Sequence, residues 1–122
     1  MNAHLHKKKY LENLNVVKKN FNHDKKNNAW KVTVLFYAAM HLVEGSFPES
    51  MRTEKHVDRF KQINALASLN SKQYSNIRVP YKKLYDYSIN ARYYDIPILD
   101  KEIEKANQYL KTLENNLEFQ EY

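Results

Sequence analysis

One stretch determines how this chain folds: Trp30-Lys-Val-Thr-Val-Leu-Phe-Tyr-Ala-Ala-Met-His-Leu-Val-Glu44. Drawn as a helix, it carries apolar side chains on nearly every face, as a helix does when other helices surround it. Its Val-Thr-Val start would also suit a strand, but the length of the run and Gly45 after it favour a helix. We therefore expect a buried central helix over residues 28–44.

The two ends of the chain show spacings of three and four residues, which place apolar side chains on one face of a helix. In residues 3–21 this face consists of Tyr10, Leu14, Val17 and Phe21. In residues 98–118 it is a regular heptad seam of Leu99, Ile103, Ala106, Leu110, Leu113 and Leu117. We expect a helix in each range, with a polar turn over residues 22–28 after the first.

Two shorter helices are expected between the central helix and the last one. Residues 53–68, capped by Ser50 or Thr53, carry a predicted core stripe of Val57, Phe60, Asn64 and Ala67, flanked by Ile63 and Leu66. Residues 69–79 are ambiguous between loop and helix. Pro80 suits the first turn of a helix over residues 80–94, because its missing N–H is not needed there.

These elements add up to a single all-α domain over residues 1–122. The chain has one glycine and three prolines, too few for the many tight turns of a sandwich or barrel. We expect an antiparallel, up-and-down bundle of four or five helices. The absence of cysteine excludes disulfides, thiolate metal sites and cysteine nucleophiles.

Lysine is concentrated near the N-terminus. Residues 1–31 hold eight lysines against two acidic residues, so the whole formal excess of +6 lies there, whereas acidic residues outnumber lysines from residue 95 onward. A basic end attracts polyanions such as nucleic acid, but it is equally a solvated lysine face or one half of a charge-complementary self-association. The longest apolar run, Val34 to Met40, falls far short of the roughly 20 residues that cross a bilayer. With no secretory signal either, we expect a cytoplasmic protein without a membrane partner.

Histidine and arginine side chains form the first candidate site. His56 and Arg59 are three residues apart and share a helix face, and we expect His41 of the central helix to converge with them. Imidazole and guanidinium groups suit phosphodiester chemistry on RNA, because histidine moves protons and arginine holds phosphate. The alternative is structural: the histidine is a core residue, and Arg59 pairs in solvent with Asp58 or Glu54.

Tyrosines form the second candidate site. The chain has ten, and six of them lie near Arg92 and other basic residues in its second half: Tyr74, Tyr81, Tyr85, Tyr87, Tyr93 and Tyr94. Aromatic rings beside cations stack nucleobases and hold phosphates, but tyrosine also fills bundle edges and dimer interfaces. His4-x-His6 is at most an adventitious metal site, so we expect no metal centre and no cofactor.

Three of these motifs together resemble the HEPN superfamily of small helical bundles, which are often tied to RNA or nucleotides. They are Phe36-Tyr-Ala-Ala-Met-His41, His56-x-x-Arg59 and Leu84-x-x-x-Ser88-x-x-x-Arg92-Tyr93. Active HEPN ribonucleases carry a histidine four to six residues after the arginine that Arg92 matches. Here Tyr93-Tyr-Asp-Ile-Pro-Ile-Leu99 follows, and no histidine occurs after His56. The resemblance thus implies the bundle and a binding role, without the usual catalytic motif.

From the resemblance we expect a non-catalytic or weakly active HEPN-like domain that binds RNA or a nucleotide, in a toxin–antitoxin or defence system. The residues expected to bind this ligand are His41, His56, Arg59, Tyr85, Ser88 and Arg92. A homodimer that uses the seam of residues 99–117, and an antitoxin-like protein partner, are further expectations. Two alternatives stay open: a divergent, metal-independent ribonuclease toxin that uses His41 or His56, and a protein-interaction module.

Overall fold

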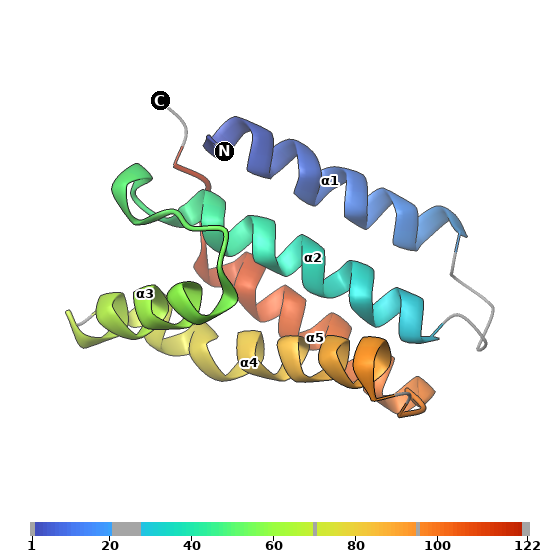
Figure 1. Cartoon of the computed structure of the whole chain (residues 1–122). Coiled ribbons are helices and arrows are strands. Elements are labelled where there is room, and N and C mark those ends of the chain that lie inside the picture. The colour runs from blue at the N-terminus through green and yellow to red at the C-terminus, as the bar shows by residue number, and fades with distance from the viewer. Residues whose placement is uncertain (1, 21–27, 70, 95, 121–122) are drawn as a thin grey trace.

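The computed structural model describes residues 2–20, 28–69, 71–94 and 96–120, and every regular element in these ranges is helical (Figure 1). The α-helices are α1 (Ala3–Asn20), α2 (Asn28–Ser46), α3 (His56–Ser68), α4 (Lys72–Tyr93) and α5 (Asp100–Asn116). A short 3-10 helix, η2 (Glu49–Met51), lies between α2 and α3. The all-α prediction is confirmed. Phe21 and nearly all of the expected polar turn lie outside the described residues.

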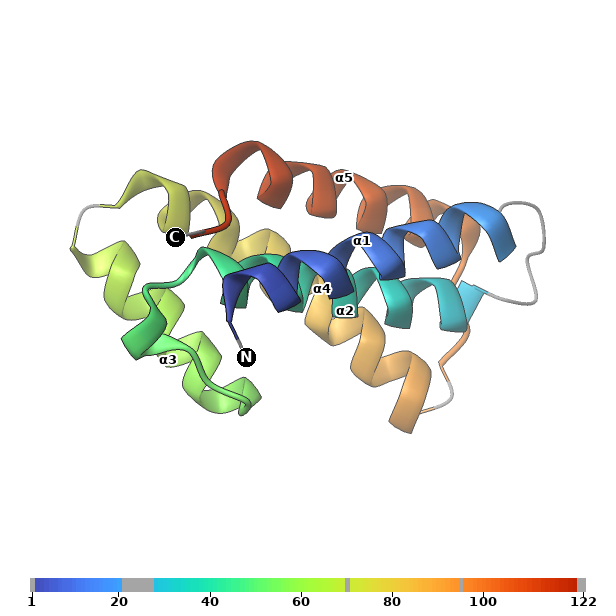
Figure 2. The ribbon, with the colours of Figure 1, turned by 90° about the horizontal axis from the view of Figure 1, so that it is seen from above.

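Helix α2 is the centre of the molecule. It packs against α1, α4 and α5, while α3 packs against α4 (Figure 2). Val32, Phe36, Ala39 and Val43 of α2 are completely buried, and their spacing of three and four residues gives one continuous core stripe. The prediction of a buried central helix is confirmed for these residues.

Trp30 departs from this pattern, because it is 57% exposed although it belongs to the same apolar run. It shares a helix face with Tyr37 and His41, seven and eleven residues later, and both of these are also incompletely buried. The helices around α2 therefore leave this stripe partly uncovered.

Helix α3 is rotated relative to its expected orientation. Val57, expected in the core, is 66% exposed, whereas Ile63 and the charged Arg59 are buried. The cause is a polar contact: Arg59 turns inward to reach Glu44 of α2, and the face that carries Ile63 turns with it. Neither expected cap of this helix is found, since the N-cap residue is Lys55 without a side-chain bond.

Helix α4 begins at Lys72, so the ambiguous segment is largely helical and Pro80 lies inside the helix rather than in its first turn. A proline there removes one backbone hydrogen bond. Burial of Tyr74, Ile77, Tyr81 and Leu84 along one face of α4 offsets this loss.

The seam of the last helix is internal. Ala106, Leu110, Leu113 and Leu117 are buried in the core, while Leu99 is exposed at the start of α5. This seam therefore does not offer the dimer surface that its heptad pattern suggested. None of the helices in the described ranges is long and apolar enough to cross a membrane.

Candidate functional site

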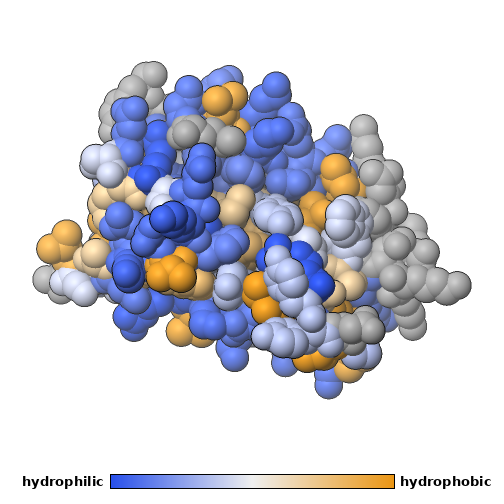
Figure 3. Space-filling view, viewed as in Figure 1, coloured by the Kyte–Doolittle hydropathy of each residue, from blue (hydrophilic) through white to orange (hydrophobic). Residues whose placement is uncertain are grey.

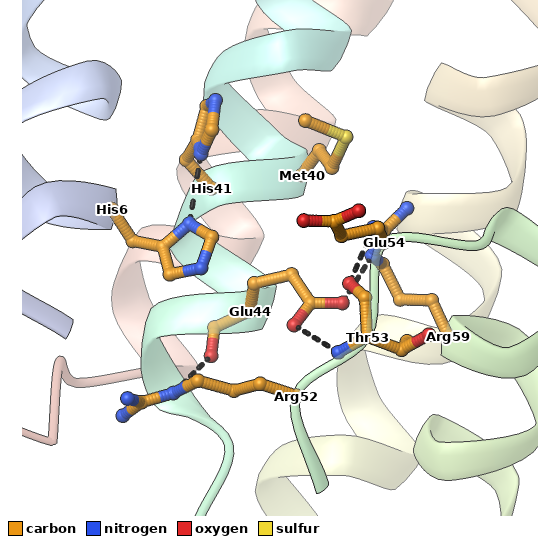
Figure 4. Close-up of a pocket in the computed structure, with 8 residues that line it drawn as sticks. All are labelled: His6, Met40, His41, Glu44, Arg52, Thr53, Glu54 and Arg59. Carbon is orange, nitrogen blue, oxygen red and sulfur yellow. Dashed lines mark hydrogen bonds and ion pairs between the residues drawn. The ribbon is translucent and has the colours of Figure 1, made fainter. Parts of the chain in front are cut away.

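A cavity of about 390 Å³ opens between α1, the second half of α2, and the segment that leads from η2 into α3. We call it the histidine pocket (Figure 4). Its lining consists of His6, Met40, His41, Glu44, Arg52, Thr53, Glu54 and Arg59. Two arginines face two carboxylates in this lining, so its formal charges balance.

Two histidines join α1 to α2 at the pocket. The Nδ1 atoms of His6 and His41 lie 2.8 Å apart, and the two rings face each other at a centroid distance of 5.1 Å. Burial, followed by the charge of His41, lowers the pKa of His6 to about 4. Burial and then Arg59 lower the pKa of His41 to about 4. Both rings are therefore neutral at pH 7, and one Nδ1 donates a hydrogen bond to the other.

The floor of the pocket is a buried ion pair. Arg59 Nε donates to Glu44 Oε1 at 2.7 Å, and the two side chains are 2% and 1% exposed. The Thr53 amide donates to the second oxygen of Glu44 at 3.0 Å. The remaining guanidinium nitrogens of Arg59 donate to the Thr53 carbonyl at 3.2 Å and to His56 Nδ1 at 2.9 Å. Every nitrogen of this guanidinium thus has a partner within the protein.

His56 does not line the pocket, but it is bonded to Arg59, which does. Because its Nδ1 accepts the arginine hydrogen bond, the hydrogen of the neutral ring sits on Nε2. Burial and then the charges of Arg59 and Arg92 lower its pKa. The imidazole packs against Tyr85 and Phe36, with centroid distances of 5.3 and 5.7 Å.

Arg92 is held near the C-terminal end of α4. Its Nη1 donates to the Tyr37 hydroxyl at 2.9 Å, its Nε to the Ser88 carbonyl at 3.2 Å and its Nη2 to the Ser88 hydroxyl at 3.3 Å. The guanidinium carbon lies 5.5 Å from the ring centre of Tyr37 and 5.1 Å from that of Tyr93. One cation is thus fixed among aromatic rings.

Lys82 also lies beside aromatic rings, with its Nζ 5.5 Å from the ring centre of Tyr85 and 5.9 Å from that of Phe60, and it forms an exposed ion pair with Asp86. We define the α4 face as Lys82, Tyr85, Arg92 and Tyr93 with the adjoining Tyr37 and His56. Strongly hydrophilic side chains are interleaved with residues of intermediate and high hydropathy over this part of the molecule in Figure 3. Such a mixture of cations and rings suits bases and phosphates together.

The expected ligand-binding residues therefore divide between two places. His56, Tyr85 and Arg92 belong to the α4 face, while His41 lies in the histidine pocket. Arg59 touches both places, but it is buried in an ion pair with Glu44, so the alternative in which it pairs in solvent with Asp58 or Glu54 is wrong.

Ser88 is completely buried, and its hydroxyl donates to the Tyr85 carbonyl. Because Ser88 is not accessible to a large ligand, its role can only be to position Arg92, which bonds to its hydroxyl and carbonyl oxygens.

Sequence reasoning missed Glu44 and His6. Glu44 could have been recognised as the one acidic residue in an apolar helix, because a carboxylate buried there needs a cation beside it. His6 was predicted only as an adventitious metal ligand, although it lies on α1 and is bonded directly to His41 on α2. Among the described residues, no group of three potential metal ligands is close enough to hold an ion.

Comparisons with protein-family models, with curated proteins and with solved structures gave no match for this chain. The likeness to HEPN domains therefore depends on the motifs alone.

Proposed function

We propose that this chain is a HEPN-like antiparallel bundle that binds single-stranded RNA through the α4 face without cutting it. The observation that carries the proposal is the guanidinium of Arg92, fixed by three hydrogen bonds beside the rings of Tyr37 and Tyr93. Two of its five N–H groups have no partner among the described residues, and they can contact a phosphate. Single-stranded RNA offers both phosphates and unpaired bases, and the α4 face matches both.

The histidines support binding more than catalysis. The Nε2 atom of His56 carries a hydrogen and its Nδ1 atom accepts from Arg59, so neither can take a proton from a ribose hydroxyl. His41 shares its Nδ1 hydrogen bond with His6. For the ribonuclease alternative, His56 would have to give up its bond with Arg59 before any proton transfer, whereas the ring of the His6–His41 pair that donates from Nδ1 keeps a basic Nε2 atom. Because that pair lies in the histidine pocket and not on the α4 face, we expect no cleavage of RNA at high protein excess.

The test is the affinity for a short fluorescent oligoribonucleotide, measured by anisotropy as a function of salt. Because phosphate contacts release counterions, the affinity should fall steeply between low and physiological salt. Arg92→Gln and Lys82→Gln should each weaken binding by about tenfold, which corresponds to about 1.4 kcal/mol. Lys105→Gln on α5 removes the same charge outside the α4 face and should change the affinity less than twofold.

A flat response to salt would exclude phosphate binding. Equal weakening by all three substitutions would assign the affinity to net charge rather than to the α4 face.

A further inference from the structure

Trp30 is the only tryptophan of the chain, and it is exposed on a helix most of whose side chains are buried. It precedes Tyr37 by two helical turns on the same face of α2, about 10 Å along the axis. Tyr37 in turn holds Arg92 through its hydroxyl. The indole of Trp30 therefore extends the α4 face along α2, in line with Tyr37, the ring that is bonded to Arg92.

The backbone beneath Trp30 is well anchored. The side-chain amide of Asn28 donates to the Ile98 carbonyl at 3.0 Å and to Asp100 Oδ1 at 2.9 Å, which ties the first turn of α2 to the start of α5. The indole is thus presented from a rigid position, and little conformational entropy is lost when a flat ligand covers it.

We propose that Trp30 is a base-stacking residue that extends the α4 face, so that a nucleobase lies on the indole while Arg92 holds a neighbouring phosphate. This inference rests on the proposed function. Stacking on an indole requires only the flat face of a base, so the contact should tolerate any of the four bases. The guanidinium beside Tyr37 favours RNA over an apolar protein partner, although Ile96 and Leu99 are exposed in the connection that leads to α5.

The single tryptophan makes the test direct, because selective excitation reports on this residue alone. Adding unlabelled oligoribonucleotide should quench the fluorescence, with the same midpoint as the anisotropy titration. Trp30→Ala should weaken binding about tenfold, and Trp30→Phe should restore most of the affinity because a ring remains. Leu11→Ala, which truncates an exposed apolar side chain of α1, is the matched control and should change nothing. Thermal unfolding of each variant verifies that the fold is kept.

The outcomes separate the two claims. Anisotropy that rises without quenching, together with wild-type affinity in Trp30→Ala, overturns the stacking role and leaves RNA binding in place. No binding in either assay overturns both claims. A fluorescence change that depends on protein concentration alone, and a dimer lost in Trp30→Ala, would make this residue a self-association contact instead.

Discussion

Arg59 shows how a residue chosen for its chemistry can be required by the fold. Its guanidinium is almost completely buried and binds Glu44, His56 and Thr53. The buried Tyr81 hydroxyl interacts electrostatically with Arg59 but makes no hydrogen bond of normal geometry with any described residue. Burial raises the pKa of this hydroxyl to about 12, and the arginine partly opposes the shift. Arg59 therefore organises the interior between the two candidate sites.

Arg59→Met should destabilise the protein by about 3–5 kcal/mol, because it leaves the Glu44 carboxylate buried with a single amide donor. Glu44→Gln should cost a similar amount by leaving the guanidinium uncompensated. In the double variant neither charge remains, so its loss should be smaller than the sum of the single losses by at least about 1 kcal/mol. Urea unfolding midpoints measure all three.

Asp86→Asn provides the control for the Arg59 cycle. It breaks the Lys82–Asp86 ion pair of 2.5 Å, whose side chains are 55% and 46% exposed. Exposed pairs contribute less than about 1 kcal/mol, so its midpoint should barely move. Strict additivity in the Glu44 and Arg59 cycle would show that the buried pair is not coupled.

At the scale of the elements, sequence patterns correctly predicted the helices in which the periodic apolar residues are also the buried ones. The buried run of α2 and the seam of α5 are such cases, and both are confirmed except at Trp30 and Leu99, which are exposed. The pattern failed for α3, because an ion pair with another helix determines which face turns inward. It also failed for the start of α4, where apolar side chains on both sides of Pro80 are buried together.

The candidate site was predictable to the same limited extent. The contact between His56 and Arg59 follows from their spacing of three residues within one helix. The contacts of Arg59 with Glu44 and of His41 with His6 join different helices. No local pattern specifies which helices become neighbours, so these partners could be found only in the structure.

Gly45 is required where the C-terminal segment crosses the end of α2. An added Cβ would lie 2.6 Å from Phe119 Cε1 and 3.2 Å from His6 Cβ, and the Gln120 amide donates to the Gly45 carbonyl at 2.8 Å. Gly45→Ala should therefore displace the Phe119 ring and destabilise the protein by about 1–3 kcal/mol, measured by urea unfolding.

The double variant with Phe119→Ala shows whether the ring is the cause. Once the ring is removed, alanine should be no worse than glycine at position 45, because alanine favours the helix by up to about 1 kcal/mol. An equal loss from Gly45→Ala in both backgrounds would refute the clash.

For the whole molecule, the attachment of α1 combines apolar packing with two polar contacts to other helices. The helix is joined to α2 by the histidine pair and to α5 by a hydrogen bond between Tyr10 and Glu114. Among its described side chains, Ala3 and Tyr10 are buried and Leu14 and Val17 pack against the core, while lysines lie on the outer face. Conditions that charge the histidines should therefore loosen this helix first.

Stability should fall with acid in a defined window. In the folded protein the pKa values of His6 and His41 are about 4, against 6.5 for an unperturbed histidine. Between these values the unfolded state binds protons that the folded state does not, so the free energy of unfolding decreases as the pH falls from about 6.5 towards 4. The loss between pH 7 and pH 5 should be on the order of 4 kcal/mol, about 2 kcal/mol for each ring, measured by urea unfolding at the two values. His41→Asn removes one of the two titrating rings and should reduce this loss by about half. His4→Gln, which replaces an exposed histidine on α1, should leave it unchanged, and the same acid sensitivity in both variants would show that the pair is not its source.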